Sequence, residues 1–239
     1  MGSGIPPILR IQQVLDKRKA WEVNMKITVF GANGQIGQEF IKRALENGEQ
    51  VKAVVRREGA LTISHPNLTI LVGNLTDEQF VSEAISGQDA VVSTLGPNMN
   101  TGRKVTARPI RDAHKTILKS MAEQGVKRFI TLATPSVKST MDKKQIATVL
   151  PAVMPKLFFP PGYEEMKGIE QLVNASQAEW TVVRIINPNL KTDGRGYAIS
   201  FGDTKAKMGV SRKNAAHCMY DAIRKTEWIG KMPIVFNKK

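Results

Sequence analysis

The chain has 239 residues, which fits one domain of ordinary to large size with a buried core. No apolar run approaches the roughly 18 residues of a membrane helix. The single cysteine, Cys218, excludes an internal disulfide and suits a reducing cytoplasm, where we expect the protein to be located. The formal net charge of +14 arises mainly from residues 181–239, which contain 12 lysines and arginines and 4 acidic residues. Aromatic residues that would stack on bases are few. We therefore expect the positive charge to attract an anionic cofactor or substrate rather than nucleic acid.

Residues 1–24 precede the predicted domain, which we place at 25–239. The opening MGSG is typical of an expression-vector remnant, and apolar residues from Ile8 onward recur at the spacing of a short amphipathic helix. Two interpretations stay open. The extension docks as a helix, or Met25 is the natural start and the preceding residues are foreign.

The stretch that organises the chain reads KITVFGANGQIG, from Lys26 to Gly37. An apolar run of strand length, Ile27 to Phe30, leads through glycines at positions 31, 34 and 37 into a helical pattern. This order predicts a dinucleotide-binding turn, in which the diphosphate lies on the free N–H groups of the helix N-terminus. An ordinary turn at Asn33-Gly34 is the competing interpretation.

The second predicted strand, Gln50 to Val55, ends in Arg56 and Arg57. An NAD enzyme places an acidic residue near this point, about 20 residues past the glycines, to bind the ribose hydroxyls. Two guanidinium groups suit a 2'-phosphate instead, because their planar forks match its oxygens. The alternative is that surface strands often end in arginine.

The third and fourth strands are predicted at Leu68 to Val72 and Asp89 to Leu95. Thr76 and Gln79 form the pattern of a capping box for a helix over 77–86. The polar and turn residues that follow the two strands lie where ligands bind in parallel sheets, so Asn74, Leu75 and Gly96 are candidate cofactor contacts. A plain turn at Gly96 is the alternative.

A polar loop over 98–107 precedes a long helix that runs to about Gln124 and carries His114, which we interpret as a surface or packing histidine rather than a metal ligand. We expect no metal site. Strand five follows at Lys127 to Ala133. The alternation of strands and helices predicts an α/β fold with a Rossmann-like, doubly wound parallel sheet.

Residues 134–162 are strongly apolar, and five prolines argue against one continuous helix there. We predict an apolar cover over the cofactor; plain packing of a connection on the core is the alternative. A helix from Tyr163 to Ser176 and a strand from Trp180 to Ile186 follow. Two further strands and a helix over 197–236 complete a small C-terminal module on the substrate side.

Several segments in this order resemble the atypical short-chain dehydrogenases with an NAD(P)H-binding domain. They are GANGQIG, VVRR, GNL, GQDAVVSTLG, GVKRFITLAT, EWTVVRIINPNL and GVSRKNAAHCMYDAI. Within that group the chain is similar to the flavin reductase and biliverdin-IXβ reductase branch and to the NmrA-like regulators. The resemblance spans residues 25 to about 236.

The resemblance implies a role for each matching position. The diphosphate turn is assigned to Gly31, Asn33, Gly34, Gln35, Ile36 and Gly37, and the 2'-phosphate contact to Arg56. Asn74 and Leu75 would flank the adenine, and Leu95 and Gly96 would line the ribose. The nicotinamide would lie near Ala133, Thr134, Asn187 and Pro188. Some members have a serine just after the threonine, whereas here Pro135 intervenes before Ser136.

Tyr163 and Lys167 stand four residues apart and resemble the Tyr-x-x-x-Lys pair of ordinary short-chain dehydrogenases, in which the tyrosine donates a proton. The third member of that set, a serine about a dozen residues upstream, is missing, because position 150 is leucine. A tyrosine at a helix start and a surface lysine are the alternative interpretation.

We therefore expect an NADPH-dependent reductase that transfers hydride to a flat conjugated acceptor, such as a flavin, a quinone or a related carbonyl compound. A redox-sensing regulator that binds NADP without turnover and signals to a protein partner is the main alternative. A sugar-nucleotide epimerase is a weaker one, because that class normally has the full Tyr/Lys/Ser set and a larger C-terminal domain.

Overall fold

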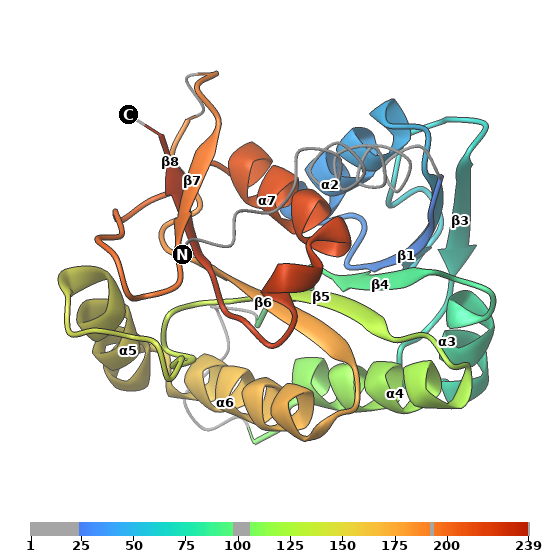
Figure 1. Ribbon diagram of the computed structural model, residues 1–239. Helices are drawn as coiled ribbons and strands as arrows, with labels where there is room; N and C mark the ends of the chain where they lie inside the picture. Colours follow the sequence, from blue (N-terminus) through green and yellow to red (C-terminus); the bar gives the residue numbers. More distant parts are fainter. Residues whose placement is uncertain (1–23, 98–105, 192–193, 239) are drawn as a thin grey trace, which may run out of the picture.

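The computed structural model describes residues 24–97, 106–191 and 194–238 (Figure 1). All but the last residue of the predicted N-terminal extension, and most of the loop predicted at 98–107, therefore lie outside the described residues. None of the described helices is long and apolar enough to cross a bilayer.

Eight strands and six α-helices are described, and most of them lie where the hydrophobic pattern predicts them. The elements are β1 Lys26–Phe30, α2 Gln35–Glu46, β2 Gln50–Val55, β3 Leu68–Val72, α3 Glu78–Ile85, β4 Ala90–Ser93, α4 Pro109–Glu123, β5 Arg128–Ala133, α5 Ile146–Phe158, α6 Pro160–Ala175, β6 Glu179–Ile185, β7 Tyr197–Ser200, α7 Arg212–Arg224, a 3-10 turn Thr226–Trp228 and β8 Ile234–Asn237.

The strands form one sheet in the order β3-β2-β1-β4-β5-β6-β8-β7. Neighbouring strands are parallel except β7, which runs antiparallel to β8 at the edge. The prediction of a doubly wound parallel sheet is confirmed. The expected C-terminal module continues this same sheet, because β8 pairs directly with β6. Strand order reverses between β1 and β4, and ligands of such sheets bind at the carboxyl ends of the strands on either side of that point.

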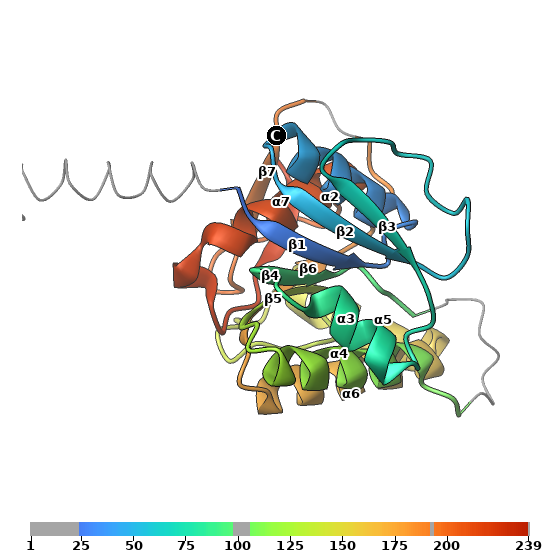
Figure 2. The same cartoon turned by 90° about the vertical axis from the view of Figure 1, so that its right-hand side faces the viewer.

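Helices cover both faces of the sheet. Figures 1 and 2 show α2 and α7 on one face and α3, α4 and α6 on the other. Each layer has its own cluster of buried apolar side chains, centred on residues such as Phe40 and Met219 on one face and Phe129 and Ile117 on the other. The central strands β4 and β5 are buried along their whole length, which explains their continuous rather than alternating hydrophobic pattern.

The N-terminus of α3 differs from the predicted capping box. Asp77 is the N-cap, and its Oδ1 accepts a hydrogen bond of 3.1 Å from the backbone N–H of Phe80. Thr76 instead donates its backbone N–H to Asn74 Oδ1 in a tight turn. An aspartate and a threonine are both strong N-cap residues, and the turn at Asn74 decides between them because it places Thr76 one residue too early.

The apolar segment 134–162 also differs from its prediction. It is not one continuous helix, but α5 contains Pro151 and Pro155 in its interior, and α6 begins at Pro160 rather than at Tyr163. Proline suits the first turn of a helix, which explains the start of α6. Within α5 each proline removes one hydrogen-bond donor, and the helix persists because its N-terminus is capped by the Thr148 hydroxyl and its flank packs against α6.

His114 is fully buried inside α4, so the packing interpretation holds and the surface interpretation does not. Its Nδ1–H donates to the carbonyl oxygen of Ile110 at 2.8 Å. Its Nε2 therefore accepts from the hydroxyl groups of Ser93 on β4 and Thr131 on β5, at 3.1 and 3.2 Å. These bonds tie α4 to the two central strands, and burial lowers the pKa of His114 to about 4.

This depressed pKa predicts an acid-sensitive contribution to stability. Between about pH 6.5 and pH 4 the unfolded chain binds a proton at His114 that the folded chain does not, so the free energy of unfolding falls as the pH falls through this window, by about 3 kcal/mol at most. The variant His114→Gln keeps a donor and an acceptor but does not titrate. In urea unfolding at a series of pH values, we expect the variant to lose less stability than wild type between about pH 7 and pH 4, and parallel curves would contradict this role.

Candidate functional site

A cavity of about 480 Å³ lies at the carboxyl ends of β1, β2 and β4 and beside the loop after β3. The first turns of α4 and α6 form its opposite wall. Seven of the predicted cofactor residues line it together: Gly31, Asn33, Arg56, Asn74, Leu75, Leu95 and Gly96. The structure thus places side by side residues that are separated by up to 65 positions in the sequence.

The glycines of the first turn are required by close contacts. Gly31 has a φ of +82°, and a Cβ atom there would lie 2.8 Å from Thr94 Oγ1 and 3.0 Å from the backbone nitrogen of Leu95. A Cβ atom at Gly37 would collide with the carbonyl oxygen of Gly31. Gly34 donates its N–H to that same carbonyl at 3.0 Å. The turn is therefore closed by backbone alone, which lets a ligand approach the chain closely.

Three helices begin beside the cavity, but they differ in what their N–H groups meet. The carboxylate of Glu165 accepts from the backbone N–H groups of Ile110 and Arg111, at 2.8 Å each, and so caps α4. The first two positions of α6 are prolines, Pro160 and Pro161, which have no N–H. Among the described residues no side chain caps α2, so the N–H groups of its first turn are free donors for an anion.

The predicted residues Gln35 and Ile36 form the first turn of α2, directly after Gly34. Their backbone N–H groups are among those that have no partner within the helix. The side chain of Gln35 is exposed, and that of Ile36 is half-buried against the core beneath the helix. Their contribution to an anion site is therefore a backbone one.

The end of β2 carries a second, more open cavity of about 370 Å³, which adjoins the first through Asn33 and Arg56. Arg57 and Ala60 complete its lining. Both arginine side chains are exposed, and the neighbouring Glu58 does not line the cavity. Two cations thus stand at one end of the nucleotide-sized cavity, where a dinucleotide would place the substituent on its adenosine ribose.

The ends of β5 and β6 lie beside each other, because these strands pair in parallel with Ala133 opposite Arg184. Ala133 is buried at the end of β5. Thr134 follows it, and its hydroxyl lies 2.6 Å from the hydroxyl of Ser136. The backbone N–H of Val137 bonds to the carbonyl of Thr134 at 3.0 Å, so a turn at Pro135 brings Ser136 back to Thr134. The intervening proline therefore does not separate the two hydroxyl groups.

Asn187 and Pro188 follow the end of β6. Asn187 has a φ of +41°, and no other non-glycine residue in the described part of the chain has a positive φ. Asparagine tolerates this conformation better than most residues, and such strain concentrates at functional sites. The side chain of Asn187 is exposed, and Pro188 is half-buried. Neither lines the two cavities described above, so their nicotinamide role stays a prediction.

Tyr163 and Lys167 both lie on α6, and no hydrogen bond joins them among the described residues. Lys167 Nζ donates to Glu170 Oε2 at 2.7 Å, and this bond raises the pKa of Lys167 above its ordinary value. Tyr163 is half-buried in the first turn of α6, next to Gly162, which lines the larger cavity. The tyrosine is thus near the cavity, whereas the charge of the lysine is already paired with a carboxylate.

Sequence reasoning missed part of the wall that faces the strand ends. Glu165 of α6 and Pro109 and Ile110 of α4 line the cavity and were not predicted, whereas Pro161 and Gly162 belong to the segment 134–162 that we predicted as a cover. A signal was present for part of this wall, because a Pro-Pro-Gly sequence at positions 160–162 favours a helix start three residues earlier than Tyr163. No signal in the sequence indicates that the carboxylate of Glu165 reaches α4, since 54 positions separate it from Arg111.

Comparison with solved structures supports the same fold. A short-chain dehydrogenase/reductase from Veillonella parvula, crystallised in complex with NADP, superposes with a TM-score of 0.73 at 15% identity and covers 90% of this chain and 95% of its own. ChuY, an anaerobilin reductase from Escherichia coli O157:H7, superposes with a TM-score of 0.70 at 17% identity and covers 90% of this chain and 98% of its own. At these identities the likeness shows the fold.

Sequence comparison identifies the family. A protein of Bacillus subtilis described as the uncharacterized sugar epimerase YhfK is 30% identical over 112 residues, which is 46% of this chain and 52% of that relative. Matches to three such relatives span only 30% to 52% of their own lengths. The NAD(P)H-binding family, by contrast, matches residues 31–226, from the first glycine of the β1–α2 turn to the 3-10 turn after α7. This chain therefore belongs to the NAD(P)H-binding family.

Proposed function

We propose that the chain is an NADPH-dependent reductase that transfers hydride to a flat conjugated acceptor, such as a flavin, a quinone or a related carbonyl compound. One observation carries the proposal. The 480 Å³ cavity runs from the glycine turn at Gly31 to Arg56, and adjoins a smaller cavity with Arg57 in its lining. It therefore offers anion-binding groups at the two positions where NADPH carries phosphate.

The residues of the first turn fit a diphosphate. Gly31 and Gly37 have no room for a Cβ atom, so the backbone of the turn is bare where a diphosphate would approach it. The uncapped N–H groups at the start of α2 would donate to the diphosphate oxygens, and the partial positive charge of the helix N-terminus would favour them. The α4 N-terminus does not compete for this anion, because Glu165 already satisfies it.

The remaining predicted contacts follow from the direction of the cavity. Asn74 and Leu75 would flank the adenine, and Leu95 and Gly96 would line the adjoining ribose. Arg56 and Arg57 would bind the 2'-phosphate. The nicotinamide would then reach the ends of β5 and β6, near Ala133, Thr134, Asn187 and Pro188. Bound NADPH supplies the hydride from C4 of this ring.

The chain's own residues would position the acceptor and supply a proton. Thr134 and Ser136 share one hydrogen bond between two hydroxyl groups, so one of the two hydrogens stays available for an acceptor atom. Tyr163 or a water molecule is the other candidate donor, and Lys167 supports Tyr163 only if it leaves Glu170. Most of the rate enhancement would come from holding donor and acceptor close in a cleft that excludes water. ChuY, which has the same fold, is described as an anaerobilin reductase, and this supports a conjugated acceptor for the present chain.

The proposal predicts turnover. The protein is incubated with NADPH and, separately, with FMN, riboflavin, a naphthoquinone and an α,β-unsaturated ketone, while the absorbance of the reduced nicotinamide is followed. We expect oxidation of NADPH with at least one acceptor, above the rate without protein. Tight binding of NADP with no turnover on any acceptor would contradict the reductase and favour a redox-sensing regulator that acts on a protein partner.

Cofactor preference is a separate prediction. A charge-assisted hydrogen bond contributes about 1.5 to 3 kcal/mol, which corresponds to about 10- to 150-fold in affinity. Arg56→Ala should weaken NADPH binding by about this factor and leave NADH binding nearly unchanged, as measured by calorimetric titration. Lys127→Ala is the matched control, because it also removes one exposed positive charge, but directly before the start of β5 and so at the edge of the sheet opposite to the cavity. An equal loss for both cofactors in Arg56→Ala would show that this arginine does not bind the 2'-phosphate.

The glycine turn offers a matched pair of substitutions. Gly31 and Gly87 both have positive φ, of +82° and +71°, but only Gly31 has atoms within 4 Å of a new Cβ. Ala therefore meets backbone strain of about 1 to 2 kcal/mol at both positions and a collision with Thr94 and Leu95 at Gly31 alone. We expect Gly31→Ala to lower NADP affinity at least about tenfold and Gly87→Ala to leave it unchanged. Similar NADP affinities for the two variants would contradict the diphosphate assignment.

A further inference from the structure

The helix α5 and the residue after it expose an apolar surface to solvent. Of the 13 large apolar side chains that are exposed in the described part of the chain, 8 lie between positions 146 and 159. The most exposed are Ile146 at 71% and Leu157 at 60%. The others are Val149, Leu150, Val153, Met154, Phe158 and Phe159. A concentration of this kind on one element marks an interaction surface.

The exposed side chains form a stripe along one side of the helix, because they recur at spacings of three and four residues. Ala147 and Thr148 are buried on the opposite side, where Ala147 packs with Ile186, Ala206, Ile234 and Phe236. Figure 1 shows α5 beyond the end of α6, at the margin of the molecule. In the described part of the segment 134–162, which we predicted as a cover over the cofactor, Pro161 and Gly162 line the 480 Å³ cavity and no residue of α5 is among its lining.

Lysines surround this stripe. Lys143 and Lys144 precede α5, Lys156 lies within it, and all three are exposed. Between positions 143 and 163 the sequence contains no aspartate or glutamate. The carboxylate of Asp142 does not offset these charges, because it forms an ion pair with the buried Arg184, with N···O distances of 2.7 and 2.8 Å.

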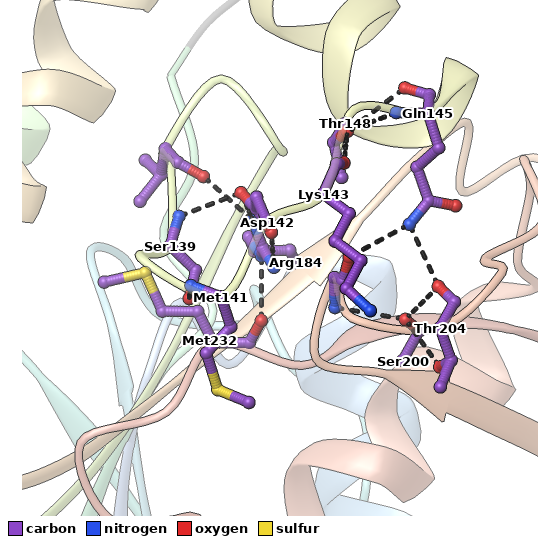
Figure 3. Close-up of polar contacts among 12 residues, drawn as sticks. Ser139, Met141, Asp142, Lys143, Gln145, Thr148, Arg184, Ser200, Thr204 and Met232 are labelled. Carbon is purple, nitrogen blue, oxygen red and sulfur yellow. Dashed lines mark hydrogen bonds and ion pairs between the residues drawn. The ribbon is translucent and has the colours of Figure 1, made fainter.

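The loop after β7 brings two more lysines to the same end of α5. Gln145 donates its side-chain amide to the carbonyls of Gly202 and Thr204, at 3.2 and 2.9 Å (Figure 3). It also accepts from the N–H of Ala206 at 2.9 Å. Lys205 and Lys207 flank Ala206 and are exposed. Asp203 is the acidic residue of this loop, so the five lysines leave a clear positive excess around the apolar stripe.

We propose that α5 docks on an anionic lipid surface, with its apolar stripe in the boundary between headgroups and acyl chains and its lysines against the lipid phosphates. A basic helix with Leu and Phe on its apolar side is the pattern of interfacial helices, and each lysine near an anionic bilayer adds to the attraction. A second copy of the chain fits less well, because a two-fold contact brings the same surface to itself and sets lysines against lysines. This inference rests on α5 and not on the proposed reductase activity.

The test is co-sedimentation of the whole chain with vesicles. We expect binding to vesicles that contain phosphatidylglycerol and much weaker binding to pure phosphatidylcholine. Leu157→Glu should lower vesicle binding more than about tenfold, because the variant loses a leucine that would insert into the lipid and places a negative charge against anionic headgroups. Ile70→Glu is the matched control, because Ile70 is an apolar side chain, 40% exposed, on the edge strand β3; it should bind as wild type does.

A second variant tests the proposal even if Leu157→Glu does not fold. Lys143→Ala/Lys144→Ala should lower binding to phosphatidylglycerol vesicles by about fivefold per lysine and leave NADP affinity unchanged. Equal binding to both kinds of vesicle, or variants that bind as wild type does, would overturn the proposal. A third outcome would also overturn the proposal. If wild type does not bind vesicles and forms a dimer in analytical ultracentrifugation that Leu157→Glu dissociates, the stripe is a contact between two copies of the chain.

Discussion

The site depends on the close approach of α2 to the end of β1. The first turn of the helix reaches the carbonyl oxygen of Gly31 so closely that residue 37 can have no side chain. From β4, Thr94 Oγ1 donates to the carbonyls of Phe30 and Gly31, with distances of 3.1 and 3.0 Å. Strand, helix and neighbouring strand are therefore joined at one point by backbone atoms and a single hydroxyl. The uncapped N-terminus of α2 is held toward the cavity as a consequence.

A different kind of contact holds the ends of β5 and β6, where we propose that the acceptor binds. The guanidinium of Arg184 is fully buried on β6 and binds Asp142 with both Nη atoms, the Met232 carbonyl at 2.8 Å and the Val137 carbonyl at 3.3 Å (Figure 3). A buried ion pair of this kind adds little net stability, but removal of either partner leaves an unpaired charge in the core. It therefore holds residues 137 and 142 against β6. The turn with the Thr134 and Ser136 hydroxyls and the start of α5 both lie beside this anchor.

The sheet and the cofactor half of the site were predictable because both are local in sequence. Short apolar runs predict the strands, the residues after β1, β2, β3 and β4 supply the contacts, and the parallel order brings Gly31, Arg56, Asn74 and Gly96 together. The opposite wall was not predictable on these grounds. Glu165 reaches α4 across 54 positions, and a buried carboxylate on a helix has no local pattern that names its partner. The prolines correctly indicated that the segment 134–162 is not one continuous helix. They did not show that α5 forms around Pro151 and Pro155, because propensity is a weak guide where capping and packing hold a helix.

The two halves of the site also differ in what a substitution can change. The β1–α2 turn of the cofactor half is built from backbone atoms and the Thr94 hydroxyl, so a new Cβ at Gly31 or Gly37 disturbs it. The acceptor side that we propose is instead formed by side chains of the segment after β5, beside Arg184. Only Phe159 separates α5 from α6, whose first turn lines the cavity and carries Glu165 to cap α4. The lipid surface that we propose for α5 would therefore lie next along the chain to the wall that Pro161, Gly162 and Glu165 contribute to the cavity.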